Sequence, residues 1–372
     1  MRILDITVAL SSLALFAAAA PAPFGKNQLP DGMPSPSPDQ VKLIEQAAHG
    51  TLPNGPPPPV ISSEGIVNLK LIAFNELFEV AFFNELITNI TNKVEGYDID
   101  EEEDHVKVLD ALKAILAVCI KNVHIQISHS LTVLVFQQEE LHALRANDAL
   151  EHFKVNKIQP CEYTFPISDF KSAIALAATF TDVVLGTLQD VVERFALGRD
   201  VDLAREIASV IGQEGEQQGW FRASQGKIPS ELPFLTTSDL NFAFTAIQDF
   251  VVPGSCPNIN EIPLRTFEGL KILSTPGPQD QNITVQFNDP DHEADHSLWL
   301  TYINQQNLPI VEPLRFVSRN GKEVQAEALF PFEENEMNGL TIAAVTKSSG
   351  PFTDASSVAQ WTLAGPGLII VN

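Results

Sequence analysis

One segment, from Ile66 to about Thr91, most strongly limits what this chain can fold into. It reads IVNLKLIAFNELFEVAFFNELITNIT and places apolar residues on most positions of a helix. A helix that is apolar nearly all round has to be buried against other elements. Glu76, Glu79 and Glu85 lie among these apolar residues, so we expect some of the three carboxylates to face the interior.

Further helical patterns predict that this helix lies in a bundle. Long helices joined by mostly short connections are typical of an up-down four-helix bundle. The expected fold class is therefore mainly α over residues 61–254. The other predicted helices cover residues 105–117, 138–153, 167–197, 200–226 and 238–250.

The sequence pattern changes from helical to β-prone after VVPGSCPN. Short β-prone runs then alternate with turn residues, and RNGK is a strong hairpin signal. We therefore expect residues 255–372 to form a smaller, β-rich, sandwich-like domain. The predicted strand segments are NITVQF, SLWLTYI, LRFVSRNGKEVQAEALF, LTIAAVTK and VAQWTLAGPGLIIV.

The N-terminal residues resemble a secretory leader. Arg2 precedes an apolar run from Ile6 to Phe16 and the small residues Ala17 to Ala20, which predicts a signal peptide over residues 1–20. The run is too short to span a bilayer, and we expect no transmembrane helix after it. Residues 21–60 are rich in Pro, Ser, Gly and Asn and are expected to be disordered. The predicted location is extracellular or in a cell wall.

The chain is strongly acidic. It has 23 Lys and Arg residues against 47 Asp and Glu residues, a formal net charge of -24. Such a protein repels nucleic acid and anionic membranes, which argues against both as partners. Cell-wall components or a second copy of the chain remain as candidate partners.

The predicted export gives meaning to the cysteines and to two sequons. Cys161 in QPCEY and Cys256 in PGSCPN lie in loop-like sequence and are predicted to form a disulfide, leaving Cys119 as the odd thiol. Asn89 and Asn282 both begin an Asn-Ile-Thr sequon, a candidate glycosylation site. An unused sequon stays an open alternative, above all at Asn89.

Residues 118–137, VCIKNVHIQISHSLTVLVFQ, interrupt two strongly helical segments. The part LTVLVF is β-branched and apolar without helical periodicity, and a structureless insertion inside a bundle helix is unusual. The codons for Val-Cys, Leu-Thr and the closing Gln can carry the signals of an intron, so we hypothesise a retained intron here. A genuine loop or an extended helix is the alternative.

Four segments together resemble a known family. EELHAL, TFTDVVLGTLQDV, VIGQEGEQQGWFR and FVVPGSCPN are similar to sequence in fungal exported ferritin-like proteins, described as late sexual development or stress-response proteins. These are distantly similar to plant desiccation-related proteins. The resemblance covers about residues 60–270 and implies a ferritin-like four-helix bundle, export, and expression tied to development or stress. It implies no defined reaction.

The segment EELH contains the first ligand pair of a possible metal site, because Glu139 and His142 lie three residues apart. A di-iron or di-manganese bundle uses one Glu from each of two helices and a Glu-x-x-His from each of the other two. Here Thr181, beside Asp182, occupies one expected Glu position, and Gln217 occupies one expected His position. The candidate site, degenerate by two ligands, comprises Glu76, Glu79, Glu139, His142, Glu214 and Gln217.

Two interpretations of this site remain open. The leading one is a metal-free polar network in the bundle centre, which must be nearly fully hydrogen-bonded to be tolerated. The alternative is bound iron or manganese, because carboxylate and imidazole groups suit these metals.

Other candidate sites are weaker. DPDHEADH, residues 289–296, offers calcium or copper ligands, although a solvated turn before a strand is the favoured explanation. The pair Glu151 and His152 is expected at an exposed helix end. A sugar platform could consist of the aromatic residues Trp299, Tyr302 and Trp361. The favoured alternative is that they lie in the core, as aromatic residues on strands usually do. We find no supported catalytic triad, nucleophile elbow or zinc-protease helix.

Three functional hypotheses follow. The first is a non-enzymatic, secreted ferritin-like protein of a fungal sexual development or stress programme. The second is an iron- or manganese-dependent oxidase or metal-sequestering protein that uses Glu79, Glu139, His142 and Glu214. The third is a glycan- or cell-wall-binding module in the β-rich domain.

Overall fold

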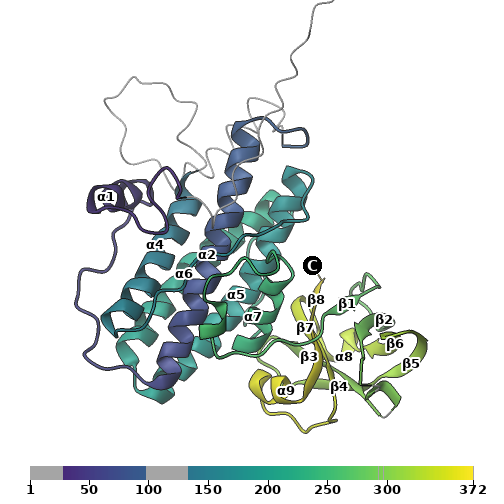
Figure 1. Cartoon of the computed structure of the whole chain (residues 1–372). Coiled ribbons are helices and arrows are strands. Elements are labelled where there is room, and N and C mark those ends of the chain that lie inside the picture. Colours follow the sequence, from purple (N-terminus) through teal and green to yellow (C-terminus); the bar gives the residue numbers. More distant parts are fainter. Residues whose placement is uncertain (1–27, 98–132, 292, 296, 372) are drawn as a thin grey trace, which may run out of the picture.

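The computed structural model describes residues 28–97, 133–291, 293–295 and 297–371. It shows a helical domain followed by a β domain (Figure 1), as the sequence predicts. In the helical domain α2 packs against α4 and α5, and α5 packs against α6 and α7. These helices are α2 (Ser63–Thr91), α4 (Val133–His152), α5 (Phe170–Gly198), α6 (Val201–Ser224) and α7 (Leu240–Gln248).

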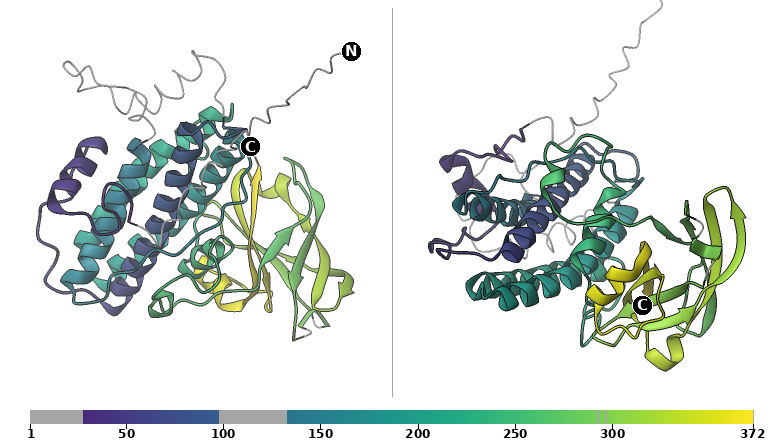
Figure 2. Two further views of the ribbon diagram at one scale, coloured as in Figure 1. Left: turned by 45° about the horizontal axis from the view of Figure 1, so that its top comes forward. Right: turned by 60° about the horizontal axis from the view of Figure 1, so that its bottom comes forward.

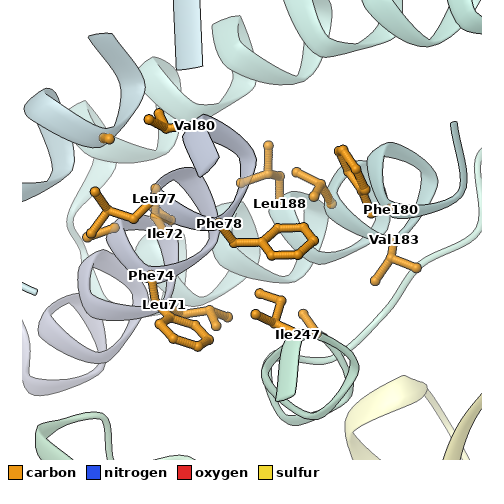
Figure 3. Close-up of a cluster of buried hydrophobic side chains, with 14 of the residues drawn as sticks. Leu71, Ile72, Phe74, Leu77, Phe78, Val80, Phe180, Val183, Leu188 and Ile247 are labelled. Carbon is orange, nitrogen blue, oxygen red and sulfur yellow. The ribbon is translucent and has the colours of Figure 1, made fainter. Parts of the chain in front are cut away.

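The helical core lies where α2, α5 and α7 meet. Phe78 of α2 and Phe180 of α5 contact edge to face with ring centroids 5.3 Å apart, and Ile247 of α7 lies in the same cluster (Figure 3). Such aromatic contacts add to the hydrophobic stabilisation of a bundle. α2 is buried along most of its length, as its all-round apolar sequence predicts.

One end of the bundle is closed by a polar clamp. Ser62 caps α2 by accepting a hydrogen bond from the amide of Gly65 at 2.9 Å, and its hydroxyl donates to Asp200 at 2.6 Å. Asp200 begins α6. A Cβ atom at Gly198 would lie 2.5 Å from the Ser62 hydroxyl, so this close approach requires glycine.

The β domain consists of two antiparallel four-stranded sheets. Their strand orders are β1-β2-β6-β5 and β4-β3-β7-β8. Asn320 pairs with Glu323 across the turn between β5 and β6, which confirms the hairpin predicted at RNGK. The strands are β1 (Leu270–Ile272), β2 (Gln281–Asn288), β3 (Trp299–Asn304), β4 (Ile310–Pro313), β5 (Arg315–Asn320), β6 (Glu323–Phe330), β7 (Gly339–Thr346) and β8 (Thr362–Val371).

Strand β7 is buried on both faces and joins the two domains. Ala343 and Val345 belong to the core between the sheets, whereas Ile342 and Ala344 belong to the core shared with the helices. The molecule therefore has three layers, the helices and then the two sheets, as the views in Figure 2 show. A strand between two apolar layers reads as a near-continuous apolar run, and LTIAAV is apolar except for Thr341.

The segment before the bundle differs from the expected disorder. Residues 38–47 form α1 (Pro38–Ala47), which Ser37 and Gln40 begin with a capping box. Met33 and Ile44 are buried, and α1 packs against α4. A few apolar residues hold this segment against the bundle. Its proline-rich composition led to the expectation of disorder, because these residues are sparse in the sequence. The predicted signal peptide lies outside the described residues.

Two further elements differ from the predicted pattern. Ala355–Trp361 is the helix α9, begun by a capping box from Asp354, although VAQW was expected to be extended. Val133–Gln137 belongs to α4, although LTVLVF lacks helical periodicity. Phe136 and Gln137 of this part of α4 are buried, and a buried stretch of helix needs no polar face. Residues 118–132, including Cys119, and the predicted helix at 105–117 lie outside the described residues, and the intron hypothesis stays a prediction.

The predicted disulfide is present. Cys161 and Cys256 are bonded and link the loop after α4 to the segment after α7. Among the described residues, α5 alone is long and apolar enough to cross a membrane by length and composition, against our expectation of no such helix. Most of its apolar window is buried inside the protein, as in the central helix of a folded core.

Ion pairs and a hydrogen bond made by Arg194 connect α5 to α7 and α9. Arg194 of α5 donates to Asp190 at 2.9 Å, to Asp239 at 3.1 Å and to the Ser356 hydroxyl at 3.2 Å. Asp239 caps α7, and Ser356 lies on α9. Burial raises the pKa of Asp190 to about 6 even though Arg194 opposes the shift.

We expect Arg194→Ala to lower the free energy of unfolding by about 3 kcal/mol, because Asp190 and Asp239 would stay buried without their cation. Urea denaturation measures this. Arg205→Ala, which removes an exposed pair with Asp202, should change stability by less than about 0.5 kcal/mol. Equal midpoints for the two variants would contradict the assigned role of Arg194.

Candidate metal centre

Three helices bring the predicted residues together at the middle of the bundle. Glu76 and Glu79 come from α2, Glu139 and His142 from α4, and Glu214 from α6. One ligand atom from each of Glu76, Glu139, His142 and Glu214 lies within 4.8 Å of the others. All four glutamates are at most 1% exposed. The helix α5 contributes no charged group to this cluster, because it has Thr181 at the expected position.

The imidazole of His142 faces three carboxylates. Its Nδ1 atom lies 3.0 Å from Oε2 of Glu139, 3.5 Å from Oε2 of Glu76 and 3.8 Å from Oε1 of Glu214. Glu139 and His142 lie three residues apart on α4, which puts them on one face of the helix. The single nitrogen thus points at the place where the carboxylates converge.

Several buried oxygen atoms in this cluster have no hydrogen-bond partner among the described residues. They include both carboxylate oxygens of Glu214, Oε2 of Glu79 and Oε1 of Gln217. Leaving buried polar atoms unpaired costs about 1–3 kcal/mol each. The metal-free network that we expected requires nearly full satisfaction, and the cluster does not provide it. A divalent cation among the converging ligand atoms would satisfy the oxygen that Glu214 offers there.

Burial and mutual repulsion set the protonation of the carboxyls. Burial raises the pKa of Glu76 to about 7, although His142 opposes the shift. Burial and then Glu139 raise the pKa of Glu214 well above its usual value, and burial and then Glu214 do the same for Glu79. For His142, burial acts against the charge, but Glu76 and Glu139 outweigh it and raise the pKa. Without a cation the cluster therefore keeps its protons to a higher pH than free carboxyl groups do.

The residues expected to bind a second metal ion do not form a complete set of ligands. Gln217 donates from Nε2 to Oε1 of Glu139 at 2.6 Å, so it supports a ligand. Asp182 does not face the centre. It accepts a hydrogen bond from Gln218 at 2.5 Å and interacts with Glu231 and Arg222 in a separate buried group.

Two supporting residues were not anticipated from the sequence. Asn75 donates to Oε1 of Glu79 at 2.9 Å, and Gln138 accepts hydrogen bonds from Gln213 at 3.1 Å and from Gln217 at 3.3 Å. The spacing of Asn75 and Glu79, one helical turn, was a usable signal. The contacts of Gln138 depend on how α4 and α6 face each other, which no local pattern specifies.

The other predicted sites are dispersed or occupied. Asp289 is buried, pairs with Arg319 at 2.7 Å and accepts from the amides of Glu293 and Ala294; His292 and His296 lie outside the described residues. Tyr302 is fully buried and donates to the Leu329 carbonyl, whereas Trp361 ends α9 and is half exposed. The three aromatics therefore form no exposed sugar platform. Asn282 is exposed, Asn89 is half-buried, and Glu151 and His152 are exposed.

The donor set defines a class of chemistry. Carboxylate oxygens with an imidazole nitrogen suit iron and manganese better than thiolate-preferring metals. Comparison of the sequence with models of known protein families and with curated proteins finds no match to either. The geometry of the cluster is thus the observation that bears on its chemistry.

We expect Glu214→Gln to weaken metal binding at least about 100-fold, since outer-sphere changes alone cost 10–100-fold. The same change should raise the free energy of unfolding of the metal-free protein at pH 7, because burial and the neighbouring Glu139 raise the pKa of Glu214, so that its carboxyl has to take up a proton or stay charged on folding. Calorimetry of metal binding and urea denaturation measure the two effects. Glu216→Gln, at an exposed position of the same helix, is the matched control. Lower metal-free stability in Glu214→Gln would refute the assignment of an unpaired carboxyl.

Metal affinity should rise with pH. Below the Glu76 pKa of about 7 the cation has to displace at least one proton, so we expect a gain in affinity of at least about tenfold per pH unit between pH 5.5 and 7. Proton release, measured by calorimetry in buffers of different ionisation enthalpy, is the direct test. A pH-independent affinity, without proton release, would mean that the cation binds elsewhere.

Proposed function

We propose that this protein is an exported, ferritin-like bundle protein that binds one iron or manganese ion per chain. The ligands are Glu76, Glu139, His142 and Glu214. The observation that carries the proposal is the convergence of their ligand atoms within 4.8 Å, with both oxygens of Glu214 buried and unpaired among the described residues. This favours the metal-binding hypothesis over the metal-free network.

Charge supports one ion instead of two. Three carboxylates and a neutral imidazole neutralise a divalent cation with one negative charge to spare, and Glu79 adds one further carboxyl nearby. A second cation would depend on Thr181 and Gln217, which are neutral and weak donors. Two cations so close together need more anionic ligands than this chain provides.

The residues around the centre have distinct roles. A bound iron or manganese ion supplies one-electron redox chemistry. Glu79 keeps Oε1 in a hydrogen bond with Asn75 and can hold or release a proton at Oε2, beside the ligands. Gln217 orients Glu139 through its amide. Support for export and for a role in fungal sexual development or stress comes from the leader-like N-terminus and from the family resemblance.

Metal content tests this proposal directly. We expect the secreted full-length protein, desalted after growth with iron or manganese, to retain close to one ion per chain by elemental mass spectrometry and native mass spectrometry. The double variant Glu139→Gln/Glu214→Gln should retain none, and Glu216→Gln should match the wild type. Two ions per chain would refute the single site, and no retained or added ion would refute metal binding.

A further inference from the structure

A cavity of about 410 Å³ lies beside the candidate metal centre. Glu76 and His142 belong to its lining as well as to the metal-ligand cluster, so the cavity reaches the centre. This volume lies within the range of small-molecule sites. The wall is mainly aliphatic and includes Leu69, Ile72, Leu141, Leu188, Leu203 and Ile207.

The cavity is elongated along the helices. On α2 its lining runs from Glu76 back to Leu69, and on α4 it runs from His142 on to Ala149. Each span covers about two turns of helix, or roughly 10 Å. The cavity therefore extends from the metal centre toward the end of the bundle at which α5 turns into α6.

The cavity opens on the side where α4 faces α6. These two helices do not pack closely on each other, whereas α4 packs on α2 and α6 packs on α5. The N-terminal strap, residues 48–53, lines the cavity, and its exposed His49 and Thr51 lie there together with exposed Ser209 of α6. A molecule can thus enter without separating packed helices.

The charges around the cavity exclude an anionic ligand. Arg145 is the one Lys or Arg in the lining, and its Nε and Nη2 atoms both donate to the Glu206 carboxylate, with Nη2 2.9 Å from Oε2. At the inner end, Glu76 and the carboxyl groups behind it offer no positive charge to a negative group. The ligand therefore meets one cationic side chain, already neutralised by Glu206, and a long aliphatic wall.

We propose that this cavity binds an uncharged, mainly aliphatic molecule of the long-chain alcohol class, which lies along the bundle with one end against Glu76 and His142. Binding depends on the cavity alone, whereas contact of this molecule with a bound ion rests on the proposed metal centre. The aliphatic wall supplies the affinity through burial of apolar surface. Because the inner end of the cavity reaches the candidate metal centre, the bound molecule would lie next to a bound ion.

Decanol and decanoate form a matched pair of probes for the full-length protein. We expect calorimetry to show one decanol per chain and at least about tenfold weaker binding of decanoate, a difference of about 1.4 kcal/mol. Val210→Trp places bulk at a half-buried lining position and should weaken decanol binding at least about tenfold. Val192→Trp, half-buried on α5 but outside this cavity, should not. Ala146→Leu fills the cavity from α4 and replaces Val210→Trp if that variant loses its helical circular dichroism.

The outcomes separate this inference from the proposed function. Decanol binding in the absence of any metal binding would support the cavity and refute the metal centre. Metal binding with no decanol binding would refute the cavity, and so would decanoate binding as tightly as decanol or insensitivity to both filling variants. In the manganese-loaded protein, the decanol proton signals nearest the centre should broaden more than those at the other end. Equal broadening along the chain would overturn the placement against Glu76 and His142.

Discussion

The structure depends on the burial of carboxyl groups in a helix that has no polar face. Glu76 and Glu79 lie on α2 among Phe and Leu side chains and are almost fully buried. Glu139 and Glu214 add two buried carboxyls opposite them, against a single imidazole. Moving one ion from water to a protein interior costs several kcal/mol even after relaxation. The cluster is therefore tolerable only when protons or a cation neutralise it, so in the proposed metal site folding and metal binding would be linked.

The rest of the fold determines which side of this centre is reachable. The sheet that contains β7 and β8 packs against α7 and α5, so one side of the helical domain is covered. The clamp between Ser62 and Asp200 holds α2 against the turn between α5 and α6. The remaining side, between α4 and α6, is bridged by long polar side chains such as Arg145 and Glu206. An open side beside a buried carboxylate cluster is the arrangement that allows a small molecule to approach it.

Sequence reasoning succeeded where a local pattern has one structural solution. The apolar run of α2, the Glu139 and His142 spacing and the RNGK turn each correspond to what the structure shows. It failed where tertiary contacts decide, because proline-rich residues before Ser63 dock α1 through a few buried side chains, and the β-prone run after Asp354 begins as a helix. The cavity could not be predicted from the sequence, since the volume of the cavity arises from the spacing of α4 and α6. The direction of Asp182 was equally inaccessible, because Gln218 and Glu231 come from elsewhere in the chain.

Gln217 is placed to support a ligand of the candidate metal centre. Its amide donates to Oε1 of Glu139, and Oε2 of the same carboxylate lies 3.0 Å from Nδ1 of His142. One oxygen is thereby fixed by Gln217 and the other faces the imidazole. Outer hydrogen bonds of this kind orient metal ligands and tune their affinity. In the single-ion site proposed above, Gln217 would therefore orient Glu139 without being a ligand itself.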